Sequence, residues 1–191
     1  MKRRSRTPAL RPGPASRMWV ALALIAFPQA SLAAQEAWQP SREAAPEDVG
    51  SIDAIIAAFY DVVSGPAGEK RDWARDSTLY VPGIRFVVVS RSEEGELVAR
   101  SFDHGTWASG SNDSLERGFH EHEIHRVTRR FGPIADVFSN YEWRTVAIGP
   151  IEGRGINSLQ LFHDGRRWWI TGATWASEEE GTPIPDAYLP D

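Results

Sequence analysis

The second half of the sequence contains four long segments rich in β-branched and aromatic residues, and these segments constrain the fold most. They are 119–131, 134–146, 156–164 and 167–176. Gly132-Pro133 separates the first two, and Asp164-Gly165 separates the last two. Long strands joined by short turns pair as antiparallel hairpins. We predict a type I′ turn at Asp164-Gly165, because this pair tolerates the positive φ angles that such a turn requires.

Helical patterns precede these strands. Apolar residues recur at helical spacing after Pro46 and predict one amphipathic helix, which ends before Gly65-Pro66; they are Ile52, Ile55, Ile56, Phe59, Val62 and Val63. Asp72 is a suitable N-cap for a second, shorter helix through Leu79. Residues 85–91 and 96–102 predict a further hairpin, and 103–117 have no clear pattern. This order predicts an α+β fold with helices on one face of a curved sheet.

The amino-terminal 33 residues have the features of a signal peptide. Six basic residues and no acidic one precede the apolar run MWVALALIAF. This run is too short to span a bilayer, and the small residues of Ser31-Leu32-Ala33 follow it. We therefore expect cleavage near Ala34 and a periplasmic or secreted protein; the alternative is an uncleaved anchor. The expected parts are a signal peptide (1–33), a linker (34–46), one domain (47–177) and a tail (178–191).

Charge and cysteine content exclude several classes of function. The whole chain has 21 basic and 26 acidic residues, so removal of the six leader cations leaves 15 against 26, a net charge of −11. Such an acidic chain repels phosphates, so neither nucleic acid nor, once the signal is cleaved, a membrane is expected as a partner. The absence of cysteine excludes thiol catalysis and cysteine-bound metals.

The order of the elements and four sequence segments resemble the nuclear transport factor 2-like superfamily, in its SnoaL-like and ketosteroid-isomerase-like branches. The segments are IIAAFYDVVSG, RDWARDSTLYVPGIRF, RRFGPIADVFSNYEWR and HDGRRWWITGATW, and the resemblance runs from about residue 48 to 177. It implies a cystatin-like cone, in which a strongly curved antiparallel sheet wraps around a long N-terminal helix and leaves a pocket. Proteins of this kind are often dimers.

The resemblance also suggests positions for catalytic groups. The isomerase branch keeps an aspartate base in its early strand, but Phe86 to Val89 is wholly apolar here, which disfavours ketosteroid-type isomerisation. The scytalone-dehydratase-like branch places a Tyr-Asp pair near the end of the first helix, and Tyr60-Asp61 matches that pair. The alternative is that Tyr60 packs in the core and Asp61 is solvated.

The segment FHEHEIHR contains the highest density of titratable residues. His120 and His122 share one strand face, and two nitrogens alone make a poor metal site, so no metal is expected. On the other face, alternation places Glu121, Glu123 and His125. Glu123 and His125 are adjacent there and are candidates for proton transfer, or else a surface pair.

Polar residues and tryptophans in the last hairpin are candidates for ligand binding. Ser158 and Gln160 share a face and either orient a ligand in the pocket or lie outward. Alternation places Trp169 and Trp175 on one face and Trp168 on the other. Because a helix layer covers only one face, we expect a homodimer through the other face, with Trp169 as a candidate contact or ligand-binding residue.

The sequence thus predicts an exported protein that binds a small apolar or aromatic ligand without a cofactor. One alternative is a cofactor-free lyase or isomerase that uses Tyr60, Asp61, Glu123 and His125. The other is a dimeric partner-binding or structural protein. Whether the chain is an enzyme is left open at this point.

Overall fold

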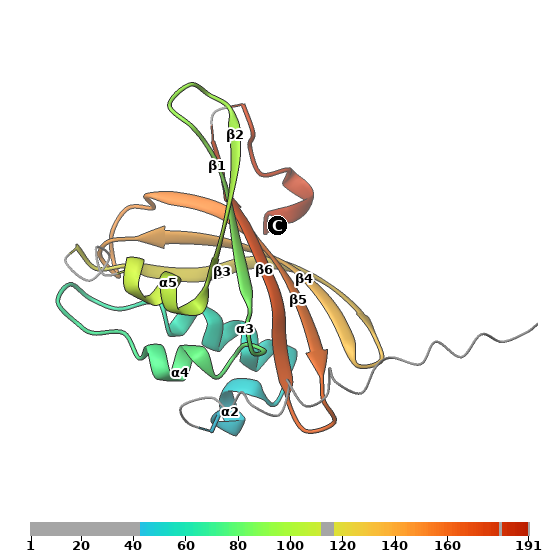
Figure 1. The fold of residues 1–191 in the computed structure, drawn as a ribbon. Coiled ribbons are helices and arrows are strands. Elements are labelled where there is room, and N and C mark those ends of the chain that lie inside the picture. Colours follow the sequence, from blue (N-terminus) through green and yellow to red (C-terminus); the bar gives the residue numbers. More distant parts are fainter. Residues whose placement is uncertain (1–42, 112–116, 180, 191) are drawn as a thin grey trace, which may run out of the picture.

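The computed structural model describes residues 43–111, 117–179 and 181–190. Within them, six strands form one curved sheet in the order β2-β1-β6-β5-β4-β3 (Figure 1). All neighbouring strands are antiparallel except β1 and β6, which are parallel. The strands are β1 (Arg85–Arg91), β2 (Leu97–Asp103), β3 (His120–Phe131), β4 (Ile134–Arg144), β5 (Gly153–His163) and β6 (Trp168–Ser177).

The expected first helix is divided into two. The helices are α2 (Pro46–Val49), α3 (Ile52–Asp61), α4 (Trp73–Ser77) and α5 (His104–Gly110), followed near the carboxyl end by the short 3-10 helix η1 (Asp186–Tyr188). The prediction of one continuous helix from Pro46 was wrong because Ser51 caps a new helix, its hydroxyl accepting a hydrogen bond of 3.0 Å from the Ala54 amide. Asp72 caps α4 as expected, by accepting from the Arg75 amide at 2.9 Å.

The helices α2 to α5 lie on one side of the sheet, and the carboxyl-terminal segment lies on the other (Figure 1). We call these the inner and outer faces. Ile55 and Ile56 of α3 are buried against inner-face residues such as Leu159 and Ile170, which are also fully buried. The core is therefore the interface between α3 and the inner face, as expected for an α+β cone.

Two β-bulges change which face the strand residues occupy. In β3, Glu123 pairs with Tyr141 and His125 pairs with Asn140, so Ile124 is an extra residue. In β6, Ile170 pairs with Leu161 and Gly172 with Gln160, so Thr171 is extra. Each extra residue inverts the alternation beyond it. Strict alternation therefore assigns the wrong face to residues beyond each bulge.

The turn between β5 and β6 differs from the expected type I′ turn. It comprises residues 164–167, and only Gly165 has a positive φ, of 100°; Asp164 does not. Instead, one carboxylate oxygen of Asp164 accepts hydrogen bonds from the amides of Arg166 and Arg167 at 2.7 and 2.9 Å. The Asp side chain thus stabilises a four-residue turn, so the type I′ prediction was wrong.

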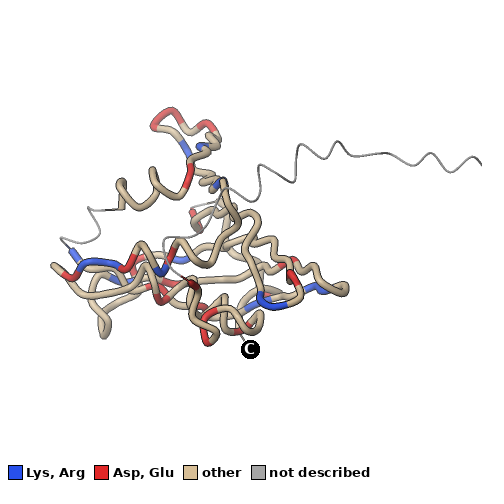
Figure 2. The backbone as a smooth tube through the Cα atoms, turned by 60° about the horizontal axis from the view of Figure 1, so that its bottom comes forward, with Lys and Arg blue, Asp and Glu red and all other residues tan. Residues whose placement is uncertain are grey.

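Residues 178–190, expected as a tail, contact the outer face in their described part. The ring of Tyr188 lies 5.1 Å from that of Phe138, and Ile184 is buried. Lys and Arg residues are interspersed with Asp and Glu along the described chain (Figure 2). None of the helices described is long and apolar enough to cross a membrane. The expected signal peptide and most of the linker lie outside the described residues.

Candidate functional site

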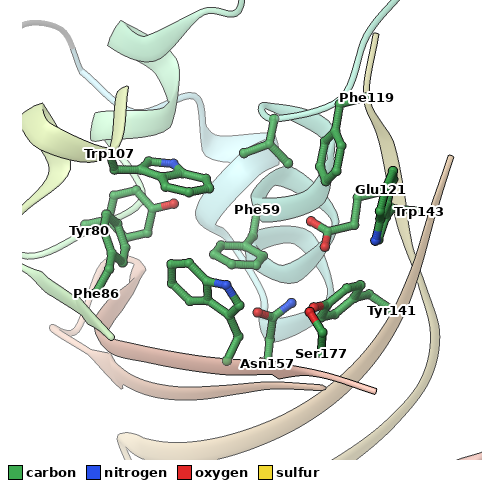
Figure 3. A pocket seen from close by; sticks show the side chains of 12 residues that line it. Phe59, Tyr80, Phe86, Trp107, Phe119, Glu121, Tyr141, Trp143, Asn157 and Ser177 are labelled. Atoms are coloured by element: carbon green, nitrogen blue, oxygen red, sulfur yellow. The ribbon is translucent and has the colours of Figure 1, made fainter. Parts of the chain in front are cut away.

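A cavity of about 210 Å³ lies between α3, α5 and the inner face of the sheet. Its walls are mainly aromatic; they comprise Phe59, Val63, Tyr80, Phe86, Trp107, Phe119, Glu121, Tyr141, Trp143, Asn157, Trp175 and Ser177. Figure 3 shows the labelled side chains among these converging on the cavity from several elements. The volume exceeds the roughly 150 Å³ that suffices for benzene in an apolar cavity. We call this cavity the aromatic pocket.

Two glycines of β5 allow one wall of the aromatic pocket to form. Gly153 pairs with Trp143 and Gly155 pairs with Tyr141, across the ladder between β4 and β5. A Cβ on Gly153 would lie 2.4 Å from the Trp143 indole nitrogen, and one on Gly155 would lie 2.3 Å from the Tyr141 hydroxyl. Both aromatic rings therefore lie across a neighbouring strand that has no side chain at these points.

The opposite wall is a cluster of rings from three different parts of the chain. Trp107 of α5 and Trp175 of β6 lie 5.5 Å apart between ring centroids, with their planes inclined by 70°. Phe86 of β1 lies 6.2 Å from each of them, inclined by 61° in both cases. Rings at these distances and angles attract one another. Together they enclose the aromatic pocket on more than one side.

Glu121 is the one carboxylate in the lining of the aromatic pocket. Figure 3 shows its carboxylate pointing into the cavity between Phe59 and Trp143. Its backbone is fixed because its amide donates to the Ser64 hydroxyl at 2.9 Å, and that hydroxyl donates back to its carbonyl. Its carboxylate, in contrast, forms no hydrogen bond or ion pair with any residue in the described part of the chain. Burial raises the pKa of this carboxyl to about 8.

A chain of hydrogen bonds runs directly beneath the pocket. The Asn157 amide, in the pocket wall, donates to the Tyr60 hydroxyl at 3.1 Å, and Tyr60 contacts the Ser139 hydroxyl at 2.7 Å. Ser139 donates to a carboxylate oxygen of Glu123 at 2.5 Å. Since Ser139 uses its proton for Glu123, Tyr60 donates to Ser139. Burial, followed by the nearby Glu121 charge, raises the pKa of the Tyr60 phenol.

A second buried carboxylate supports the wall that carries Tyr80. Asp76 is fully buried and accepts a hydrogen bond from the Tyr80 hydroxyl at 2.8 Å. Its other oxygen lies 2.8 Å from Nε2 of His104, the first residue of α5. Asp76 therefore fixes a pocket residue and also ties α5, which carries Trp107, to the core.

The four predicted catalytic residues do not converge. Tyr60 and Glu123 are linked through Ser139, but neither lines the aromatic pocket. Asp61 is exposed and pairs with Arg75 at 2.5 Å. The bulge at Ile124 places His125 opposite Asn140, on the outer face, so the prediction that His125 lies beside Glu123 on one face was wrong.

The three predicted ligand-binding residues lie on the outer face. Leu159 and Leu161 occupy the inner face, so Ser158 and Gln160 point away from the aromatic pocket and share a shallow hollow beside Tyr188. Trp169 lies under the Arg167 guanidinium at 3.7 Å and donates to Asp164 at 2.8 Å. Trp175 lines the pocket instead, so the prediction that Trp169 and Trp175 share a face was wrong, because Thr171 is bulged.

Sequence reasoning missed the central residue of the pocket, Glu121, although a signal was present. Phe119, Glu121 and Glu123 alternate before the bulge, and the apolar Phe119 marks that face as the inner one. Glu121 therefore follows an aromatic residue on the buried side of the strand. Among the described residues, no group of three or more His, Asp or Glu could hold a metal ion. His122 instead contacts Glu142 at 3.0 Å.

Comparison with solved structures identifies the fold. A protein with a cystatin-like fold from Nostoc punctiforme PCC 73102 is similar at a TM-score of 0.52 and 12% identity, over 72% of this chain and 96% of that chain. An NTF-2-like protein from Silicibacter pomeroyi DSS-3 gives 0.49 and 15% identity, over 68% of this chain and 94% of that one. No protein-family model and no curated protein sequence matches the chain. The expected α+β cone with a cystatin-like fold is confirmed.

Proposed function

We propose that this protein binds a small, largely apolar molecule in the aromatic pocket. The observation that supports this most strongly is the cavity itself, about 210 Å³ in volume and bounded by rings, with a single inward carboxylate. Ligand sites of proteins are commonly concave and apolar, with a few polar groups that fix orientation. Glu121 and Asn157 are such groups here.

The geometry favours binding over the lyase or isomerase alternative. Proton transfer needs an acid or base within hydrogen-bond reach of the substrate. Of the residues expected in that role, Asp61 and His125 point elsewhere, and Tyr60 is bonded to Ser139 beneath the pocket. Glu121 is the one carboxylate in the lining of the cavity, and it points into the cavity. One carboxylate can hold and orient a ligand without a second catalytic partner.

Thermal unfolding with small aromatic probes tests this proposal. Toluene, naphthalene and tert-butylbenzene fit a cavity of this size, and a compound that binds only the folded protein raises its Tm. We expect at least one of them to raise the Tm of the wild type. Val63 lines the pocket, so Val63→Phe fills part of the cavity and should abolish the increase.

The matched control is Val146→Phe, because Val146 is exposed and does not line the pocket. This variant should respond to the probes as the wild type does. An increase in Tm that persists in Val63→Phe would place binding elsewhere. If none of the three probes changes the Tm of the wild type, the proposal fails.

We also propose that the protein acts outside the cytoplasm after removal of residues 1–33. The basic front, the short apolar run and Ser31-Leu32-Ala33 support this proposal. Sequencing the amino terminus of the exported protein should give a start near Ala34. An amino terminus at Met1 on the mature protein would contradict it.

A further inference from the structure

We propose that the ligand of the aromatic pocket is an organic cation: a protonated or quaternary amine that carries a small apolar group. In this proposal, which rests on the proposed function, the nitrogen lies against the Glu121 carboxylate and the faces of the neighbouring rings. The charge of the pocket, the chemistry of its walls and the protonation of Glu121 each support it.

The first argument is the charge of the pocket. Glu121 is the one carboxylate in its lining, and no described Lys, Arg or His pairs with it. An ionised carboxylate without a partner is unfavourable in a largely apolar, half-buried pocket. A cationic ligand supplies the missing partner, whereas an anionic ligand would be repelled. The excess of acidic over basic residues in the whole chain acts in the same direction over longer range.

The second argument is the chemistry of the walls. The face of an aromatic ring carries partial negative charge and attracts ammonium groups, tryptophan most strongly. Three tryptophans line the pocket: Trp107, Trp143 and Trp175. Trp143 is the cross-strand partner of Glu121 and stacks on Phe119 at 5.6 Å. The carboxylate and an indole are therefore neighbours on adjacent strands, so both can contact one ammonium group.

The third argument is that Glu121 can ionise when a cation binds. The titratable groups around the pocket on which the Glu121 charge acts are Tyr60 of α3, Tyr80 before β1 and Tyr141 of β4. Burial raises the pKa of each of these phenols, that of Tyr141 to about 12, so they stay neutral. His104 bonds to Asp76 instead.

Burial raises the pKa of Glu121 to about 8, so this carboxyl in the pocket lining changes charge near neutral pH. A bound cation favours the ionised carboxylate and so lowers that pKa. Binding at pH 7 should then release a proton to the buffer. Affinity for a permanent cation should increase with pH until Glu121 is ionised in the free protein.

An isosteric pair of probes tests the inference directly. Phenyltrimethylammonium and tert-butylbenzene have the same shape, but only the first is charged. Their affinities are measured at pH 8.5 by quenching of tryptophan fluorescence. We expect the cation to bind about tenfold more tightly, from its contacts with the carboxylate and the rings. Calorimetry at pH 7 in two buffers of different ionisation enthalpy should show proton release.

The variant Glu121→Gln should strongly reduce the preference for the cation and abolish the proton release, while retaining the affinity for tert-butylbenzene. Glu96→Gln removes a charge from the exposed β1–β2 turn and should change neither. If tert-butylbenzene binds as tightly as the cation, the inference is overturned and the pocket remains a site for neutral ligands. An affinity for the cation that decreases with increasing pH would also overturn it. If neither probe binds, the inference fails together with the proposed function.

Discussion

At the scale of single residues, the most unusual group is the Glu121 carboxylate. Two other carboxylates on the inner-face side of the sheet have hydrogen-bond partners. Glu123 accepts from Ser139, and Asp76 accepts from Tyr80 and contacts His104. Glu121 has only its backbone fixed, by Ser64. A side chain held in position but without a partner costs stability in the free protein. Such a cost is typical of residues kept for binding.

The stability of the protein should therefore depend on pH through Glu121. Burial raises the pKa of this carboxyl from 4.5 to about 8, so between these values the folded protein holds a proton that the unfolded chain releases. The free energy of unfolding thus decreases as pH rises through this window. We expect a loss of about 1–3 kcal/mol, less than the full penalty because solvent reaches the pocket.

The measurement is chemical denaturation at pH 5, 6.5 and 8.5 for the wild type and Glu121→Gln. Because glutamine does not titrate, the variant should gain stability relative to the wild type as pH rises. Other carboxylates cancel in this difference. Parallel curves for the two proteins would show that the Glu121 pKa is not raised.

At the scale of secondary structure elements, the sequence predicted the strands well but not the faces of their residues. All six strands and α4 lie close to their expected positions, because β-branched runs, turns and the Asp72 cap are local signals. The faces depend on bulges at Ile124 and Thr171, which come from pairing with the neighbouring strand. For this reason His125 and Trp175 were assigned to the wrong face. The pocket residues Glu121 and Trp143 lie outside the bulges and were not identified, although alternation from Phe119 marks Glu121 as an inner-face residue.

The glycines of β5 give a prediction at this scale. The three atoms nearest to a Cβ on Gly153 would all belong to the Trp143 ring, at 2.4 to 3.3 Å. Gly153→Ala should therefore displace that ring into the pocket, lower the affinity for aromatic probes and destabilise the fold by about 1–3 kcal/mol. Probe titration and chemical denaturation measure the two effects. Gly110→Ala is the control, because a Cβ there would meet no atom within 4 Å. If the two variants had the same probe affinity and stability, Gly153 would not be needed to make room for Trp143.

At the scale of the whole molecule, the two faces of the sheet differ in how they are covered. Helices and the pocket occupy the inner face, and residues of the carboxyl-terminal segment cover part of the outer face. Elsewhere on the outer face, one row of paired apolar residues crosses four strands: Phe131, Ile134, Phe162 and Trp169. Phe131 and Ile134 are 82% and 56% exposed. Rows of this kind commonly mark interfaces.

We propose that this row is the contact between two copies of the chain. Trp169→Asp would then place a charge in the interface and weaken dimerisation by on the order of 3 kcal/mol, with the fold retained. Sedimentation should show a dimer for the wild type at micromolar concentration and a monomer for the variant, with unchanged circular dichroism. A wild-type monomer at that concentration would rule the dimer out, and the row would need another occupant.

The most direct test of the central claim, that the aromatic pocket binds the ligand, is the NMR response of the tryptophan indoles. Trp107, Trp143 and Trp175 line the pocket, whereas Trp168 is buried in the core and Trp169 lies on the outer face. On addition of tert-butylbenzene or phenyltrimethylammonium, the first three indole N–H signals should shift and the last two should not. Shifts confined to Trp168 and Trp169, or no shift with either probe, would contradict the account.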